Sequence, residues 1–585
     1  MKILRQIGWG RALCLLLLVW LVFLLFTIGY LRHEPDTQVA QRLSEALKEL
    51  DSLHKKHTEL NNLVLEYYIG DAQLKPEEKA LLHKNLEKVI GTNIQVGYPP
   101  VQNAVGQPST EYEALKRKLH SGILEFWWFV SSEVKKIRKE AENFSPLLAS
   151  KFNNILDLGI EHKRSLIKDV SGLNHADGYA SWRQNEFEEL SSLIQRRLDY
   201  LQNPSDCSKA KKLVCNLNKG CGFGCQLHHV IYCFIMAYGL ERTLILKSKG
   251  WRYGVSGWES VFFPLSRTCT SANGSSHGPW RANGNVQVMN LPIIDSLTPR
   301  SKFLPGAVPN DIAGRLTRIH GNPTVWWIGQ FLKYMLKYQP ATKQMLDDFG
   351  RKVNFQNPIV GVHIRRTDKV GTEAAFHSVE EYMSHVEEYF QQLLVSQPVP
   401  QKRIYLATDD PKVFTEIRQK YPEYEVLGDA VISKSASLGN RYSRSSLDGI
   451  ITDIHFLART DFLVCTFSSQ VCRIAYEIMN ALVPDAADHF KSLDDVYYFG
   501  GQEPHYHVAV LPHTAKTPQE MNLKVGDILT IAGNHWDGYS KGSNLRSQVY
   551  ASLFPSFKVQ PKVETADFPT YRQVPLKAPE SEPVR

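Results

Sequence analysis

The chain has 585 residues, 43% hydrophobic and 22% charged, an ordinary globular composition with room for about three or four domains. Its formal net charge of +8 is mild for this length, which excludes the strongly basic footprint of a nucleic-acid-binding protein and agrees with an anionic ligand. We therefore expect no nucleic-acid partner.

An apolar run at residues 12–31 follows Lys2, Arg5 and Arg11. The run is long enough to cross a bilayer, and basic flanking residues favour the cytoplasmic side. These features predict a cytoplasmic tail at 1–11, a transmembrane signal anchor at 12–31 and a lumenal remainder, which is a single-pass type II arrangement. No small-residue cleavage pattern follows the run, and this disfavours a cleaved signal peptide.

A stem with a short coiled coil is expected at residues 32–109. Leu43, Leu50, His57 and Val64 recur every seven residues, which is the spacing of a coiled-coil core position. The histidine weakens this pattern, so a lone amphipathic helix is the alternative.

Long helices are expected at residues 110–202. Leu119, Ile123, Phe126 and Trp127 lie at helical spacing and form an apolar, partly aromatic stripe. Such a stripe is more typical of packing than of a ligand site.

A first parallel α/β lobe is predicted at residues 203–357, because short apolar runs at 212–217 and 243–247 alternate with helical stretches. The glycine-rich turn at 218–225 lacks the G-x-G-x-x-G spacing of dinucleotide sites. It fits the edge of an active-site cleft, a phosphate cradle or a tight disulfide loop.

A second α/β lobe is predicted at residues 358–499, and it opens with a β-branched strand at 358–364 that breaks abruptly into charge. Ligands bind at the carboxyl ends of such strands. Arg365 and Arg366 suit a diphosphate, because guanidinium groups match phosphate oxygens, and Glu373 is close enough in sequence to act as a base. The alternative is a solvated turn with ordinary salt bridges.

The chain changes character at residues 500–562, where short strand-like runs alternate with turns. The run at 553–559 is similar to the closing strand of an SH3 barrel. Residues 563–585 hold several prolines and charges and are expected to be disordered.

Cysteine usage indicates disulfides. Eight of the nine cysteines follow the predicted anchor, and an even number in an oxidising compartment favours pairing. A zinc site is the alternative, but the spacings lack the usual ligand pattern. The residues alone leave the connectivity open.

Four stretches together resemble the Golgi α-1,6-fucosyltransferases, which add core fucose to N-glycans. They are residues 363–377, 405–410, 461–472 and 533–542, and the resemblance spans roughly 111–559. It implies a two-lobed, Rossmann-like (GT-B-like) α/β core, an SH3-like β-barrel and a homodimer formed by the helical region. It also implies residence in the Golgi membrane with the catalytic part in the lumen.

The activity implied by this resemblance is inverting transfer of fucose from GDP-β-L-fucose to the 6-hydroxyl of the innermost N-acetylglucosamine of N-glycans. A fucosyltransferase with a different acceptor is one alternative. An inactive glycan-binding or SH3 scaffold protein is another.

The resemblance and the chemistry together nominate site residues. Glu373 is the expected base, and Arg365 and Lys369 the expected catalytic cations. The expected donor-site residues are His363, Arg365, Arg366, Asp368, Asp409, Asp410, Asp453, Ser469, Gly222 and Tyr253. The expected acceptor-site residues are Lys219, Asp295, Gln470, Asp494 and His535. The implied disulfides are Cys207–Cys269, Cys215–Cys233, Cys221–Cys225 and Cys465–Cys472.

No metal or other cofactor is expected. The acidic pairs at 409–410 and 494–495 lack the D-x-D spacing with which metal-dependent glycosyltransferases hold Mn²⁺. Arginines are available to neutralise a diphosphate instead, and the resemblance also implies metal independence.

Overall fold

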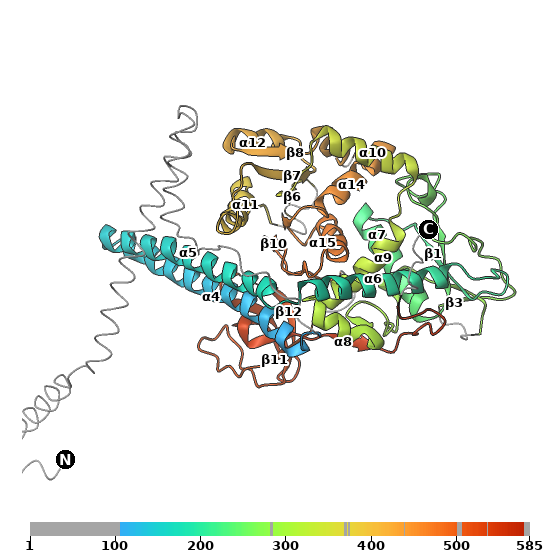
Figure 1. Ribbon diagram of the computed structural model, residues 1–585, viewed down its shortest axis with the longest axis horizontal. Coiled ribbons are helices and arrows are strands. Elements are labelled where there is room, and N and C mark those ends of the chain that lie inside the picture. Colours follow the sequence, from blue (N-terminus) through green and yellow to red (C-terminus); the bar gives the residue numbers. More distant parts are fainter. Residues whose placement is uncertain are drawn as a thin grey trace, which may run out of the picture. The chain divides into compact units, whose positions relative to one another are not determined.

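The computed structural model describes residues 106–280, 285–367, 371, 375–437, 439–499, 506–534 and 536–577 (Figure 1). The predicted coiled coil and nearly all of the predicted stem lie outside the described residues. Within the described part the fold is mixed α/β with two parallel sheets, as the sequence predicted.

The predicted membrane anchor requires a correction. Residues 12–31 lie outside the described residues. Among the helices that the structure describes, none combines the length and the apolarity that a bilayer crossing needs. The predicted placement as a single-pass type II protein of the Golgi membrane is therefore not supported.

Three long helices open the described part, as predicted. They are α4 (Thr110–Glu142), α5 (Pro146–Ala176) and α6 (Ala180–Gln202). The helices α4 and α5 pack side by side (Figure 1). The side chain of Ser109 caps α4, and Ser145 caps α5 just before the proline that begins it.

The first lobe contains a four-stranded parallel sheet in the order β2-β1-β4-β3. Its helices pack around this sheet, and α7 is buried along nearly its whole length. The strands are β1 (Lys212–Asn216), β2 (Thr243–Lys247), β3 (His277–Pro279) and β4 (Val288–Asn290). The other elements are α7 (Phe223–Gly239), β5 (Ala307–Pro309), α8 (Asn310–Ile319), α9 (Pro323–Met335) and α10 (Pro340–Lys352).

The second lobe contains a five-stranded parallel sheet in the order β10-β9-β6-β7-β8. The strands are β6 (Val360–Ile364), β7 (Lys402–Thr408), β8 (Tyr424–Leu427), β9 (Phe462–Cys465) and β10 (Phe490–Ser492). The helices are α11 (Val379–Leu394), α12 (Lys412–Lys420), α13 (Ala430–Ser435), α14 (Arg444–Leu457) and α15 (Gln470–Leu482).

Both faces of this second sheet are buried, but against different partners. Val360, Val362 and Ile364 pack with residues of α11 and α12. Alternate positions such as Tyr405 and Ala407 belong to a larger apolar core that runs through the first lobe. Because strand side chains alternate, a strand such as β7 contributes to two cores, and the two lobes share one of them.

Residues 506–561 form a five-stranded antiparallel sheet in the order β14-β13-β12-β11-β15. The predicted closing strand at 553–559 is wrong in detail. That stretch holds the end of one strand, a 3₁₀ turn and the start of another. The strands are β11 (Tyr506–Ala509), β12 (Ile528–Asn534), β13 (Tyr539–Asn544), β14 (Val549–Pro555) and β15 (Val559–Pro561), with the turn at Ser556–Lys558.

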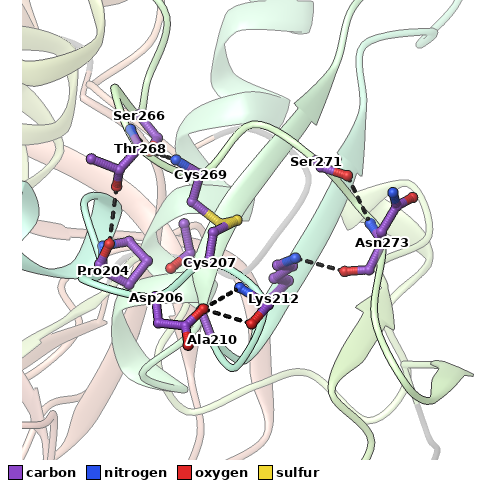
Figure 2. Close-up of a disulfide and its surroundings, with 12 residues drawn as sticks. Pro204, Asp206, Cys207, Ala210, Lys212, Ser266, Thr268, Cys269, Ser271 and Asn273 are labelled. Atoms are coloured by element: carbon purple, nitrogen blue, oxygen red, sulfur yellow. Dashed lines mark hydrogen bonds between the residues drawn. A yellow bond between two sulfur atoms is a disulfide. The ribbon is translucent and has the colours of Figure 1, made fainter.

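All four disulfides that the resemblance implied are present: Cys207–Cys269, Cys215–Cys233, Cys221–Cys225 and Cys465–Cys472. Figure 2 shows the first of them, which joins the segment before β1 to the loop after Ser266. The alternative of a zinc site is not supported. His229 does lie close to Cys215 and Cys233, but those two sulfur atoms are bonded to each other.

The C-terminal tail was predicted to be disordered over 563–585, and this is wrong for the described part, which reaches residue 577. Strand β16 (Glu564–Ala566) pairs in parallel with β5 of the first lobe. Phe568, Tyr571 and Val574 are buried in the shared core, and the Tyr571 hydroxyl donates to the Tyr238 carbonyl at 2.6 Å. Buried aromatic side chains therefore outweigh the proline-rich composition.

We expect deletion of residues 562–585 to lower the melting temperature of the protein markedly. Burial of each large apolar side chain contributes roughly 1.5–3 kcal/mol, and the tail inserts three. Thermal unfolding followed by circular dichroism measures the effect. Deletion of 578–585 alone is the matched control, because it removes none of the described contacts, and equal melting temperatures for the two truncations would contradict the prediction.

Candidate active site

A buried carboxylate organises the loop that follows β6. Asp409, at the end of the neighbouring strand β7, accepts hydrogen bonds from the backbone N–H of Arg366 at 2.8 Å and of Thr367 at 3.1 Å. It also pairs with the Arg365 guanidinium at 3.1 Å. Burial alone would raise its pKa, but the Arg365 charge and these bonds hold the pKa of Asp409 below its usual value. The carboxylate therefore stays ionised and fixes the loop.

The two loop arginines have different surroundings. Arg366 pairs with Glu416 on α12 at 3.2 Å, and its guanidinium lies 4.9 Å from the Phe376 ring centre. Arg365 lies instead within electrostatic reach of Tyr253 in the first lobe: burial raises the pKa of Tyr253, and the Arg365 charge opposes that shift. The two loop arginines are thus held by different carboxylates, Arg365 by Asp409 and Arg366 by Glu416.

A buried polar group lies on the face of the second sheet that borders the shared core. Tyr405 is paired with Gly361 across β6 and β7, and its hydroxyl donates to Asp453 on α14 at 3.0 Å. Burial raises the pKa of Asp453 to about 7. His363 is two residues beyond Gly361, so its side chain leaves the sheet on this face too.

His363 is suited to act as a neutral ligand group. It is 6% exposed, and its Nδ1 atom has no hydrogen-bond partner among the described residues. Burial, with a smaller contribution from the Arg365 charge, lowers the pKa of His363 to about 4. A neutral imidazole with one open nitrogen can accept or donate a single hydrogen bond to a bound molecule.

The turn between β9 and α15 forms the next part of this edge. Ser469 precedes the first residue of α15, but its side chain makes no capping hydrogen bond. Simple N-capping, the structural alternative for this serine, is thus not what the structure shows. The Cys465–Cys472 disulfide spans the turn, and the exposed N–H groups of a helix start favour an anion.

Three of the predicted acceptor-site residues line one cavity of about 310 Å³. Lys219 and Asp295 form an ion pair at its side, and Gln470 contributes from the first turn of α15. A much larger cavity, of about 2440 Å³, involves α4, α5, α11 and the antiparallel sheet, and none of the predicted site residues that the structure describes lines it.

The remaining predicted residues have more local roles. The Asp494 Oδ1 atom accepts from the Ser492 hydroxyl at 3.0 Å and from the Ser468 N–H at 3.4 Å, which ties the segment after β10 to the turn before α15. Asp410 accepts from the Lys412 N–H at 3.0 Å at the start of α12. Gly222 precedes α7, and an added Cβ there would meet no atom within 4 Å.

Tyr253 links this region to the helix that follows the glycine-rich turn. Its hydroxyl accepts from the Phe223 N–H at 3.0 Å, and its ring lies edge-on to Tyr442, 5.1 Å between centroids. Four further predicted residues lie outside the described residues: Asp368, Lys369, Glu373 and His535.

Sequence reasoning missed several residues of the small cavity. Its lining also contains His228, His229, Arg473 and Tyr498, and buried Glu477 lies behind them. His228 and His229 are adjacent on α7, whose residues are mostly apolar, and this was the available signal. Buried polar side chains usually have hydrogen-bond partners, so two histidines in a mostly apolar helix indicate partners elsewhere in the fold.

An ionised arginine, a neutral histidine and a helix start thus surround the carboxyl edge of a parallel sheet, next to a polar cavity. Parallel α/β enzymes bind ligands at this edge, and these groups match a phosphate-bearing ligand. The fold and site therefore define an α/β enzyme that acts on an anionic substrate.

Comparison with known proteins then gives the family. Residues 2–498 match the family described as alpha-(1,6)-fucosyltransferase N- and catalytic domains. The alpha-(1,6)-fucosyltransferase of Drosophila melanogaster is 47% identical, over 96% of this chain and 97% of that protein. The alpha-(1,6)-fucosyltransferase of Caenorhabditis elegans is 38% identical, over 92% and 96%. The chain belongs to the α-1,6-fucosyltransferase family and is an enzyme of fucose transfer.

Among solved structures, a NodZ alpha-1,6-fucosyltransferase soaked with GDP-fucose is 16% identical and has a TM-score of 0.28, over 46% of this chain and 93% of that one.

Proposed function

We propose that the protein transfers L-fucose from GDP-β-L-fucose to the 6-hydroxyl of the innermost N-acetylglucosamine of N-glycans. The observation that carries the proposal is the ion pair of Arg365 with Asp409 at the carboxyl edge of β6, in a chain of the fucosyltransferase family. A fixed guanidinium there suits a leaving diphosphate, whose charge grows in the transition state.

The donor then occupies the edge of the second sheet. In this proposal Asp453 accepts hydrogen bonds from the guanine base, and His363 contacts the base or its ribose. Arg365 and the N-terminal end of α15 at Ser469 bind the diphosphate, and Tyr253 and Gly222 border it from the first lobe. Arg366 supports the loop through Glu416 rather than by contact with phosphate.

The acceptor glycan occupies the neighbouring cavity. Lys219, Asp295 and Gln470 contact it there, with Asp494 and His535 completing the site. The carboxylate of Glu373 removes the proton from the attacking hydroxyl, and displacement of GDP inverts the anomeric carbon in one step. Lys369 and Asp368 assist at the diphosphate side.

No metal ion is required in this mechanism. Asp409, one of the carboxylates that a metal would need, is already engaged by Arg365, Arg366 and Thr367. Asp410 bonds to the start of α12. The cationic role therefore falls to arginine.

We further propose that the two α/β lobes have a GT-B-like arrangement and that residues 506–561 are an SH3-like barrel. A homodimer through α4 and α5 is also part of the proposal. Leu119, Phe126, Leu147 and Leu158 on these helices are all about half exposed or more, and exposed apolar rows on paired helices favour helix–helix association.

The test of the function is a linkage assay. The protein is incubated with GDP-fucose and a defined N-glycan, with and without EDTA, and the product linkage is mapped. We expect α-1,6-linked core fucose at equal rates in both. Fucose on another hydroxyl would contradict the proposed acceptor. Activity that EDTA abolishes and Mn²⁺ restores would contradict the proposed role of Asp409.

Replacement of the base and of the anion-binding cation should have separable effects. Glu373→Gln keeps shape but removes the base, so turnover should fall by on the order of 10²–10⁴ with GDP affinity almost unchanged. Arg365→Ala removes charge from both the bound and the departing diphosphate, so turnover and GDP affinity should both fall. Steady-state kinetics and calorimetric titration with GDP measure the two quantities. Near-normal turnover of Glu373→Gln would show that another group is the base.

Donor binding should depend on pH through Asp453. The ionised carboxylate accepts hydrogen bonds from guanine, and its pKa in the free enzyme is about 7. Affinity for GDP-fucose should therefore be highest above pH 7 and should fall as pH drops through 7, approaching about tenfold per unit. GDP-fucose is the right probe because its doubly esterified diphosphate does not titrate in this range. Asp453→Asn should bind weakly at pH 8 and lose the pH dependence; an unchanged pH profile would exclude this role.

A further inference from the structure

Two adjacent histidines on α7 border the small cavity, and they have opposite hydrogen-bond environments. The Nδ1 atom of His229 faces the Ile294 N–H at 3.3 Å, whereas its Nε2 atom faces the Asn216 carbonyl at 3.2 Å. One nitrogen thus faces a donor and the other an acceptor, as in a neutral imidazole. Burial lowers the pKa of His229 to about 4, in agreement with that state.

His228 differs because both of its ring nitrogens face oxygen atoms. Its Nε2 atom lies 3.0 Å from each carboxylate oxygen of Glu477, and its Nδ1 atom lies 2.8 Å from the Oε1 atom of Gln470. Glu477 is 1% exposed and also accepts from the Tyr497 hydroxyl at 2.6 Å. An amide oxygen is an acceptor only, so in this pairing the Nδ1–H of His228 donates to Gln470.

This arrangement determines the orientation of the Gln470 amide. With its oxygen held by the N–H of His228, the amide must turn its NH₂ group away from the histidine. Gln470 lies at the start of α15 and borders the small cavity together with His228. We propose that His228, anchored by Glu477, is a positioning residue that makes Gln470 present its NH₂ group as a hydrogen-bond donor to an oxygen of the acceptor sugar.

The surroundings keep His228 in place. Gln470 and Glu477 are seven residues apart on α15, so both lie on the side of that helix that faces α7. The His228 ring is stacked on Tyr232, 5.9 Å between centroids and 21° between planes. The Tyr232 hydroxyl in turn donates to the Phe499 carbonyl at the edge of the cavity. The histidine therefore links helices from both lobes.

The inference rests on the proposed function, and a double-mutant cycle tests it. The variants are His228→Gln, Gln470→Ala and the double variant, assayed with GDP-fucose and the N-glycan of the linkage assay. A glutamine at 228 is too short and too flexible to bridge Glu477 and Gln470 as the ring does. We expect His228→Gln to raise the KM for the glycan about 5–30-fold, which corresponds to loss of one oriented hydrogen bond. The KM for GDP-fucose should stay within about twofold of the wild-type value.

In the double variant the KM for the glycan should equal that of Gln470→Ala alone, because His228 acts through Gln470. Effects that multiply, or an equal rise in both KM values, would show a merely structural role and overturn the proposal. Gln470→Glu provides a second test, since glutamate keeps the contact with His228 but offers no NH₂. It should be impaired as severely as Gln470→Ala, and near-normal glycan KM would refute the donor role.

Two controls separate this inference from the proposed function. Calorimetric titration with GDP and the melting temperature show whether each variant is folded with an intact donor site; a His228→Gln protein that has lost GDP binding refutes a specific acceptor role. If the wild-type enzyme does not transfer fucose to the glycan at all, the proposed function fails. If the wild-type enzyme does transfer fucose but the effects of the two substitutions on the glycan KM multiply, only the proposed role of His228 fails.

Discussion

The structure depends on the close packing of α15 against helices of the first lobe. A Cβ atom added at Gly329 on α9 would lie 2.4 Å from the Glu477 carbonyl oxygen, and one added at Gly224 on α7 would lie 2.8 Å from the Gln470 Cβ. Only glycine permits these approaches. The helix α15 is thus held on both sides. Ser469 in the turn and Gln470 at the cavity both lie at the start of this helix. The turn and the cavity are thus fixed relative to each other.

The loop at the charged edge of the second sheet is also fixed by contacts within the protein. An ordinary salt bridge on a surface contributes little, but Asp409 is buried and its carboxylate receives two backbone N–H groups as well as a guanidinium. The backbone bonds fix the loop whether or not ligand is bound. Arg365 is therefore oriented in advance, and under the proposed mechanism little reorganisation is left for the reaction.

The sequence predicted those parts of the fold and the site that depend on residues close together in the chain. The β-branched run that precedes Arg365 predicted the strand, and the runs at 212–217, 243–247 and 358–364 end within two residues of the observed strands. Asp409 was nominated from the sequence as a donor-site residue, and the structure shows it paired with Arg365. The disulfide pairing came from resemblance, because spacing alone left it open.

The features that the sequence did not predict depend on contacts between residues far apart in the chain. His228 and Glu477 are 249 positions apart, and nothing in the sequence near either indicates the other. The tail looked disordered because composition counts prolines and charges, whereas its order comes from Phe568, Tyr571 and Val574 inserted into a core built elsewhere. The three anchors recur every third residue, but a run of three is too short to predict a helix or a strand.

The returning tail has a consequence for how the protein is made. Tyr571 bonds to a residue 333 positions earlier, and β16 pairs with a strand made long before it. During synthesis from the N-terminus, the first lobe emerges from the ribosome with part of its apolar core uncovered. That surface is covered only after the antiparallel sheet and the last residues have been translated. Nascent chains that stall before residues 564–574 would therefore expose an aggregation-prone surface that the folded enzyme covers.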